Sequence, residues 1–304
     1  MRNDSKIAAL NERHGLTGIA RIEAGNGGLP KVRIETKSAS ADVYLYGAQV
    51  TSWVPAGFDE VLFLSEKSHW QEGKPIRGGI PVCFPWFRGK PDDKQAPTHG
   101  FVRTKEWTLN AIRREENDAV TVILSTESDA ESRRWWPYRF RLEYAITVWK
   151  TLTLELKMQN TGDGELQFQE ALHTYFRVGD VQRVTVKGLD GVRYLDNRDG
   201  NREKLQDGGL ILTKQTDNAY LDATGAVEIV DPVLGRRLVT EKQKSVSTIV
   251  WNPWSNGAAA LADFGDEEWQ GMLCAEGGNV LGQPVHLDTG RSHTMSVSLT
   301  ASRL

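Results

Sequence analysis

The stretch Tyr138-Arg-Phe-Arg-Leu-Glu-Tyr-Ala-Ile-Thr-Val148 alternates apolar and mostly polar side chains along its whole length. The same period of two returns in Leu152–Met158 and again in Met295–Leu299. Alternation of this kind places one face of a β-strand on a core and the other face toward solvent. These three segments therefore predict strands that each bury one face.

Most of the chain outside these segments follows the same pattern. Short apolar runs are separated by turn sequences such as Asn160-Thr-Gly-Asp-Gly164, and Ser5–Arg13 is one of the few helical candidates. So many half-buried strands with few short helices predict an all-β fold, a large antiparallel β-sandwich. The polar stretch Arg193–Asp217 is interpreted as an elaborated loop. Without a linker or an internal repeat, residues 1–304 are expected to form a single domain.

Composition narrows the class of protein. The 304 residues are 39% apolar and 25% charged, which is typical of a globular protein rather than a disordered one. A net charge of −3 argues against a general nucleic-acid binder but leaves room for a local anion site. Two cysteines cannot form a disulfide framework, and no stretch is typical of a signal peptide or a membrane span. We therefore expect a cytoplasmic protein without nucleic-acid or membrane partners.

Two arginines stand out within motifs that break the alternation. Arg77 begins the stretch Arg-Gly-Gly-Ile-Pro-Val-Cys-Phe-Pro-Trp-Phe87, whose glycines and prolines make a poor continuous strand. Arg103 ends the stretch Pro97-Thr-His-Gly-Phe-Val-Arg103. If the two guanidinium groups converge, they form a clamp for a divalent anion, because their forked donors match phosphate oxygens. On residue type alone, the alternative for Arg77 is a surface arginine with a solvated head.

Two further candidates lie in apolar segments. His173 is within Ala171-Leu-His-Thr-Tyr-Phe176, and Glu276 ends Met272-Leu-Cys-Ala-Glu276. Taken singly, such a histidine is more often a satisfied core residue and such a glutamate a solvated one. The chain has no metal-binding spacing such as His-x-His, so no metal is expected. The remaining histidines are predicted on the surface or in loops: His14, His69, His286 and His293.

As an ordered set, these segments resemble the aldose 1-epimerase-like superfamily, in particular its hexose-6-phosphate mutarotase (glucose-6-phosphate 1-epimerase) branch. The resemblance covers roughly residues 30–300 and leaves residues 1–30 as an N-terminal extension packed on the domain. It implies the galactose mutarotase-like supersandwich. Mutarotases of free sugars typically show Asn-His-x-Tyr-Phe-Asn where this chain has Leu-His-Thr-Tyr-Phe-Arg, which favours a phosphorylated sugar. The segments that carry the match are Gly47–Trp53, Ile76–Phe87, His99–Arg103, Ala171–Phe176 and Cys274–Val280.

The resemblance also implies roles for individual residues. His173 and Glu276 match the catalytic pair of the family, and Arg77 and Arg103 match its substrate-binding arginines. Asp217 matches an acidic residue that contacts sugar hydroxyls. Thr98 and His99 lie in the segment that lines the pocket. The chain departs from the family pattern at Thr98, where many relatives have glutamine, at Arg88, where glycine is expected, and at Gly277.

The implied activity is the interconversion of α and β anomers of hexose 6-phosphates, with Glu276 as base and His173 as acid. It requires no cofactor, and we expect a monomer whose partner is a small sugar phosphate. Two alternatives remain open. One is a non-catalytic module that binds carbohydrate or sugar phosphate on the same fold. The other is a glycosidase, which would use a carboxylate pair such as Asp217 and Glu276.

Overall fold

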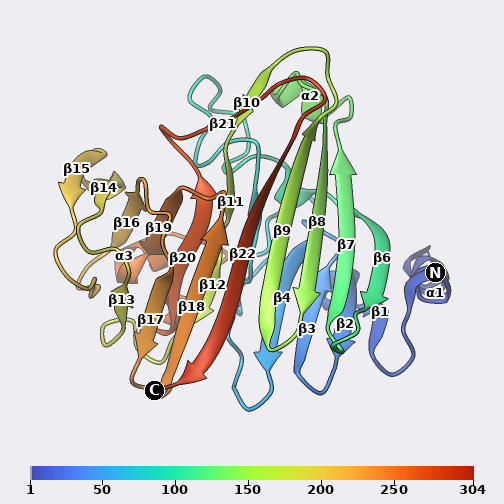
Figure 1. Ribbon diagram of the computed structural model, residues 1–304, viewed down its shortest axis with the longest axis horizontal. Coiled ribbons are helices and arrows are strands. Elements are labelled where there is room, and N and C mark those ends of the chain that lie inside the picture. The colour runs from blue at the N-terminus through green and yellow to red at the C-terminus, as the bar shows by residue number, and fades with distance from the viewer. Residues whose placement is uncertain (1) are drawn as a thin grey trace.

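The alternating segments lie side by side in the middle of an eight-stranded antiparallel sheet, here called the β9 sheet (Figure 1). The computed structural model describes residues 2–304. The strands of the β9 sheet follow one another in space in the order β13 (Thr185–Lys187), β17 (Val227–Asp231), β18 (Arg236–Gln243), β22 (Ser292–Arg303), β9 (Thr151–Asn160), β8 (Phe140–Val148), β7 (Val120–Glu127) and β6 (Thr108–Arg114).

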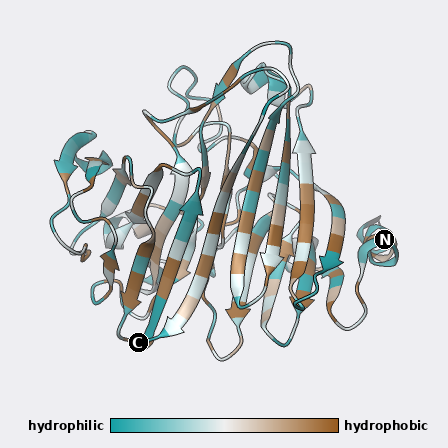
Figure 2. Cartoon of the chain, viewed as in Figure 1, coloured by the Kyte–Doolittle hydropathy of each residue, from teal (hydrophilic) through white to brown (hydrophobic). Residues whose placement is uncertain are grey.

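The register of β8, β9 and β22 explains their alternation. Tyr144 lies opposite Leu156, which lies opposite Met295, and all three side chains are fully buried. Directly opposed residues of antiparallel strands share one face, so each such row adds to a continuous apolar surface. Burying one side chain of this size contributes about 1.5–3 kcal/mol. Figure 2 shows the resulting bands of hydrophobic and hydrophilic residues along these strands.

A second eight-stranded sheet, here called the β20 sheet, packs behind the first (Figure 1). It carries the segments that the sequence singled out for function. Seven of its strands run in the order β15 (Arg202–Leu205), β14 (Arg193–Asp196), β16 (Thr216–Tyr220), β19 (Ser247–Asn252), β20 (Met272–Asn279), β11 (Glu170–Leu172) and β5 (Val82–Cys83). The eighth, β12 (Tyr175–Arg177), pairs with the central strand β20 beside β11.

The N-terminal third adds a four-stranded sheet, here called the β3 sheet. Its strands, in order, are β1 (Ala20–Ala24), β2 (Pro30–Glu35), β3 (Ala39–Tyr44) and β4 (Gln49–Pro55). The strands β10 (Leu166–Phe168) and β21 (Val285–Leu287) form a separate pair. The helices between residues 2 and 304 are α1 (Arg2–His14), α2 (Ser132–Trp135) and α3 (Trp254–Ala259), with the 3₁₀ turns η1 (Asn26–Gly28), η2 (Val102–Thr104), η3 (Asn197–Asp199) and η4 (Glu268–Gly271).

One hydrophobic cluster contains residues of all three sheets, among them Trp53 of the β3 sheet, Leu154 of the β9 sheet and Leu273 of the β20 sheet. α1 packs against the same cluster through Ile7 and Leu10. The predicted all-β sandwich with few short helices is confirmed. Within the described residues, none of the helices has the length and apolar character that crossing a lipid bilayer requires.

Three expectations about local structure need correction. β8 begins at Phe140, and Tyr138 precedes it with about a third of its surface exposed. The stretch 193–217, interpreted as a loop, contains the hairpin β14–β15, whose strands are too short to produce a readable alternation. His14 and His293, predicted on the surface, are largely buried; His14 ends α1, and His293 lies 2.9 Å from Glu170.

Candidate active site

One face of the β20 sheet gathers the predicted site residues. Asp217 lies opposite Trp251, and Trp251 lies opposite Cys274. Glu276 follows Cys274 by two residues on β20, so both side chains point to the same face as Asp217. Register alone therefore brings together carboxyl groups from β16 and β20, which are far apart in the sequence.

Glu276 is a buried carboxyl group without hydrogen-bond donors. Its side chain is 1% exposed, and neither of its oxygens has a hydrogen-bond partner among residues 2–304. Burial raises the pKa of Glu276 well above its ordinary value, and the charge of Asp217 raises it further. Shifts in this direction, caused by burial and a like charge, are common at functional sites, because a carboxyl group that exchanges protons near neutral pH needs a raised pKa.

His173 lies between β11 and β12, where its backbone N–H donates to the carbonyl of Pro81 at 3.0 Å. Its imidazole stacks on the ring of Tyr175, with centroids 4.7 Å apart and planes 13° apart. The rings of His99 and Trp251 meet it edge-on, with centroid distances of 5.5 and 6.1 Å. Three aromatic neighbours thus fix the plane of the imidazole.

His173 and Glu276 are direct neighbours. Nδ1 of His173 lies 3.3 Å from Oε1 of Glu276, but the two atoms are not aligned as a hydrogen bond. Burial lowers the pKa of His173 well below its ordinary value, and the charges of Arg103 and Arg77 add to that effect. Burial disfavours both charged forms, so it favours a carboxylic acid beside a neutral imidazole.

Arg77 reaches this face from the loop before β5. Its guanidinium donates to the hydroxyl of Tyr175 at 3.0 Å and to Asp263 at 3.1 Å. Gly78 and Gly79 follow with φ of 118° and 62°, and a Cβ at either position would collide with neighbouring backbone. The paired glycines therefore permit the close turn that aims Arg77 inward, and Asp263 balances its charge.

Arg103, in η2, is almost fully buried. Nη2 donates to the backbone carbonyl of Thr98 at 2.8 Å, and no carboxylate of residues 2–304 lies within ion-pair distance. Burial lowers the pKa of Arg103, and repulsion from the Arg77 guanidinium contributes to the same shift. The charge of Asp263 acts on Arg103 in the opposite sense, but no carboxylate of residues 2–304 forms an ion pair with Arg103, and in that sense its charge is uncompensated.

His99 packs between the two motifs. It has φ of 64° and is followed by Gly100 with φ of 74°, so the chain turns sharply toward Phe84. Nδ1 of His99 accepts a hydrogen bond from the backbone N–H of Arg88 at 3.1 Å. Burial lowers the pKa of His99 well below its ordinary value, with Arg103 and His173 as further causes. His99 is therefore a neutral imidazole that carries its proton on Nε2.

Both oxygens of Asp217 are engaged. Oδ1 accepts from Nη2 of Arg88 at 2.6 Å, and Oδ2 accepts from Nδ2 of Asn197 at 2.5 Å. Arg88 also donates to Asn201 at 3.1 Å, so its guanidinium joins the loop after β5 to the turn between β14 and β15. These contacts hold the Asp217 carboxylate in one orientation.

The three departures from the family pattern lie in different places. Thr98 has an exposed side chain and approaches the site only through its carbonyl. Arg88 enters the site and pairs with Asp217. Gly277 points away from Glu276, and a Cβ there would lie 3.0 Å from Val297 of the β9 sheet. Only Arg88 therefore brings a charged group to the site.

Several residues of this site were not identified from the sequence. Tyr175 and Trp251 orient His173, Asp263 neutralises Arg77, and Cys274 adjoins Glu276. Tyr175 lies in the stretch Ala171–Phe176, where nothing in the sequence distinguishes it from a core aromatic residue. Asp263 is a lone aspartate in a loop, and only the folded chain brings it to Arg77. The alternation along β20 would have placed Cys274 beside Glu276.

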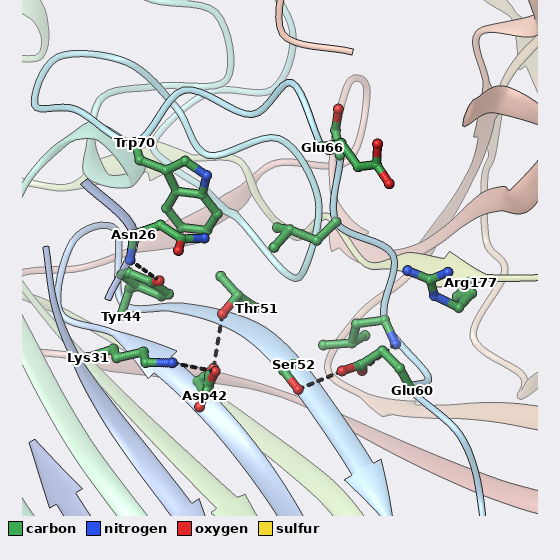
Figure 3. Close-up of a pocket in the computed structure, with 13 residues that line it drawn as sticks. Asn26, Lys31, Asp42, Tyr44, Thr51, Ser52, Glu60, Glu66, Trp70 and Arg177 are labelled. Carbon is green, nitrogen blue, oxygen red and sulfur yellow. Dashed lines mark hydrogen bonds and ion pairs between the residues drawn. The ribbon is translucent and has the colours of Figure 1, made fainter. Parts of the chain in front are cut away.

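A separate cleft of about 390 Å³ opens between the β3 sheet and the loop that carries Trp70 (Figure 3). Trp70 packs on Tyr44 with ring centroids 5.0 Å apart. Lys31 is paired with Asp42 at 2.7 Å, within the same cleft. None of the predicted site residues lines it.

The chain resembles known proteins over nearly its whole length. The sequence model described as aldose 1-epimerase matches residues 30–300. A protein of Cenchrus ciliaris named "Putative glucose-6-phosphate 1-epimerase" is 35% identical over 90% of this chain and 85% of its own. A protein of the same name from Escherichia coli K12 is 34% identical over 82% of each chain.

A solved structure agrees with these matches. The crystal structure of a "putative mutarotase" from Salmonella typhimurium superposes with a TM-score of 0.89 and 28% identity, covering 96% of both chains. The architecture is thus the galactose mutarotase-like fold implied by the resemblance. The chain belongs to the aldose 1-epimerase family and is an epimerase, an enzyme of the isomerase class.

Proposed function

We propose that this enzyme interconverts the α and β anomers of D-hexose 6-phosphates without a cofactor, with Glu276 and His173 as its acid–base pair. The observation that carries the proposal is the buried pair itself. Nδ1 and Oε1 lie 3.3 Å apart, and neither atom has a hydrogen-bond partner in the described part of the chain. Buried polar atoms are rarely left unpaired, so these atoms are available to a substrate.

Anomerisation requires opening the sugar ring. Glu276 as carboxylate removes the proton of the O1 hydroxyl, and His173 as imidazolium delivers a proton to O5 as the C1–O5 bond breaks. The products are an open-chain aldehyde, a carboxylic acid and a neutral imidazole. After rotation about C1–C2, the reverse transfers close the ring on the other face of C1.

The protons of this cycle balance within the pair. The reactive state and the open-chain state each hold one proton on the two side chains and differ only in its position. The burial that favours the neutral pair therefore favours the open-chain stage, and no proton need come from solvent. The substrate must shift the balance back toward carboxylate and imidazolium for ring opening to begin.

The arginines suit the phosphate of the substrate. A phosphate monoester carries close to two negative charges near neutral pH, and guanidinium groups bind such oxygens in a fork. We assign Arg103 as the principal anchor because its charge is uncompensated, whereas Asp263 already balances Arg77. Anchoring the phosphate would hold O1 and O5 against the acid–base pair, which accelerates the reaction by orientation.

The remaining residues are assigned to the sugar. Asp217, oriented by Arg88 and Asn197, is suited to accept hydrogen bonds from hydroxyl groups. His99 is assigned to donate from Nε2, and Thr98 contributes the backbone carbonyl that accepts from Arg103. The names of the curated relatives support a phosphorylated hexose as substrate. Because both oxygens of Asp217 are engaged, it is poorly suited to be the second carboxylate of a glycosidase.

The test is two-dimensional NMR exchange between the anomers of glucose 6-phosphate, with and without enzyme. We expect exchange far above the spontaneous rate in the wild type, and a loss of about 10²–10⁴-fold in Glu276→Gln and in His173→Asn. Binding without acceleration would instead identify a non-catalytic sugar-phosphate module. Hydrolysis of a chromogenic glycoside would identify a glycosidase.

A further inference from the structure

Three side chains with metal-binding donors meet at the candidate active site. One donor atom each from His173, Cys274 and Glu276 lies within 4.8 Å of the others. All three residues are more than nine-tenths buried. The cluster follows from the register, because Cys274 and Glu276 share a face of β20 and Cys274 lies opposite Tyr175, which stacks on His173.

The spacing of two of these donors already fits a tetrahedral metal. In a tetrahedral site with metal–ligand bonds of about 2.0 Å, neighbouring N and O ligands are about 3.3 Å apart. Nδ1 of His173 and Oε1 of Glu276 are 3.3 Å apart. Neither atom has a hydrogen-bond partner among residues 2–304, so a metal would displace no existing contact of theirs. Only the Cys274 thiol would need to approach.

The donor set selects the type of ion. Nitrogen, sulfur and oxygen from His, Cys and Glu together favour Zn²⁺, whereas Mg²⁺ and Ca²⁺ favour sets of oxygen ligands. A bound Zn²⁺ would be neutralised by one thiolate and one carboxylate. The complex would therefore add no net charge to a buried site that already contains two guanidinium groups.

We propose that His173, Cys274 and Glu276 form a zinc site whose occupation inhibits the epimerase. Zinc would bind the same atoms that the sugar requires for proton transfer, so metal and substrate exclude each other. The binding itself depends only on the geometry of the three side chains. The inhibition rests on the proposed function.

The test uses the full-length wild type and two matched cysteine variants. Cys83 is fully buried and, through the pairing of β5, β11 and β20, lies on the same face of the β20 sheet, but it is not part of the cluster. Cys274→Ser removes a ligand, whereas Cys83→Ser makes the same chemical change at a neighbouring cysteine that gives the cluster no ligand. Glu276→Gln removes a second ligand with little change in shape.

Binding is measured first, by calorimetric titration with ZnCl₂ and by the absorption spectrum with CoCl₂. We expect one ion per chain in the wild type and in Cys83→Ser, with the charge-transfer band of a cobalt thiolate. We expect the band to disappear in Cys274→Ser. In Cys274→Ser and Glu276→Gln the affinity for zinc should fall at least about tenfold, because replacing a residue that only hydrogen-bonds to a metal ligand already lowers the affinity by that much.

Inhibition is measured second, as the NMR exchange rate at increasing ZnCl₂. Zinc should inhibit the wild type, EDTA should reverse the inhibition, and glucose 6-phosphate should relieve it by competition. In Cys274→Ser the half-inhibitory concentration of zinc should be at least about tenfold higher. The proposed site would be rejected if the wild type binds no zinc. It would also be rejected if the cobalt–thiolate band persists in Cys274→Ser or disappears in Cys83→Ser. Zinc binding without inhibition would overturn the exclusion of substrate. Zinc binding to a protein that accelerates no anomer exchange would leave the site standing and reject the proposed function.

Discussion

Replacing Glu276 by glutamine should make the protein more stable at alkaline pH while removing its activity. The side chain is 1% exposed and neither oxygen has a hydrogen-bond partner between residues 2 and 304. Glutamine keeps the volume but cannot ionise. Because burial raises the pKa of Glu276 in the folded state, the wild type loses stability as the pH rises through that pKa, and the variant does not.

The size of the effect follows from the cost of an unpaired buried group. Leaving a buried polar group unsatisfied costs about 1–3 kcal/mol, and a charged group costs more. Glutamine leaves a neutral unpaired group in the same place, so the substitution removes only the extra cost of the charge, which we take as about 1–3 kcal/mol at pH values above the raised pKa. With about 2.1 cal/mol/K of unfolding entropy per residue, 1 kcal/mol corresponds to about 1.6 °C in a chain of 304 residues. The melting temperature should then rise by about 2–5 °C.

The assay compares thermal unfolding of the wild type and Glu276→Gln at pH 5 and at pH 9. The difference should be small at pH 5, where the buried carboxyl is protonated, and should appear at pH 9. Exchange of the anomers of glucose 6-phosphate, measured on the same samples, should fall about 10²–10⁴-fold. A variant that is equally or less stable at both pH values, or that keeps most of the wild-type rate, would refute the reasoning.

Three further substitutions test the assignments around the pair. Arg103→Met should raise KM for glucose 6-phosphate about 10–150-fold and change KM for glucose little, because the variant loses a charge-assisted contact of about 1.5–3 kcal/mol. Equal effects on both sugars would reject the phosphate role. Arg88→Met should release one oxygen of Asp217 and raise KM about two- to tenfold for both sugars alike, which kinetics on the two substrates would show. An effect confined to the phosphorylated sugar would contradict this role. Gly100→Ala would place a Cβ 1.8 Å from the carbonyl oxygen of Phe84 at a φ of 74°. Its free energy of unfolding should therefore fall by several kcal/mol in denaturation measurements, and an unchanged value would contradict the close approach.

The fold was largely predictable because its strongest signal is local. The alternation in β8, β9 and β22 depends only on which face of each strand is buried, and the three strands are neighbours in the sheet. The hairpin β14–β15 was missed because strands of four residues at a sheet edge have little buried surface to produce a pattern.

The candidate site was predictable only in part. The register of the β20 sheet brings Asp217 and Glu276 to one face, and no pattern within either segment encodes that pairing. The ion pair between Arg77 and Asp263 joins residues almost two hundred positions apart. The sequence does not reveal which arginine lacks an ion-pair partner, because that depends on where the folded chain places the acidic residues.

The hairpin β14–β15 has a consequence for how enzymes of this type diverge. It forms one edge of the β20 sheet, where β14 pairs with β16, and its turn carries Asn197 and Asn201 to the Asp217–Arg88 pair. Insertions or substitutions in this turn would alter the contacts of Asp217 while leaving β11, β12 and β20, which hold His173 and Glu276, untouched. If Asp217 contacts the sugar as proposed, changes in this peripheral turn would alter sugar preference and leave the proposed acid–base pair in the centre of the sheet in place.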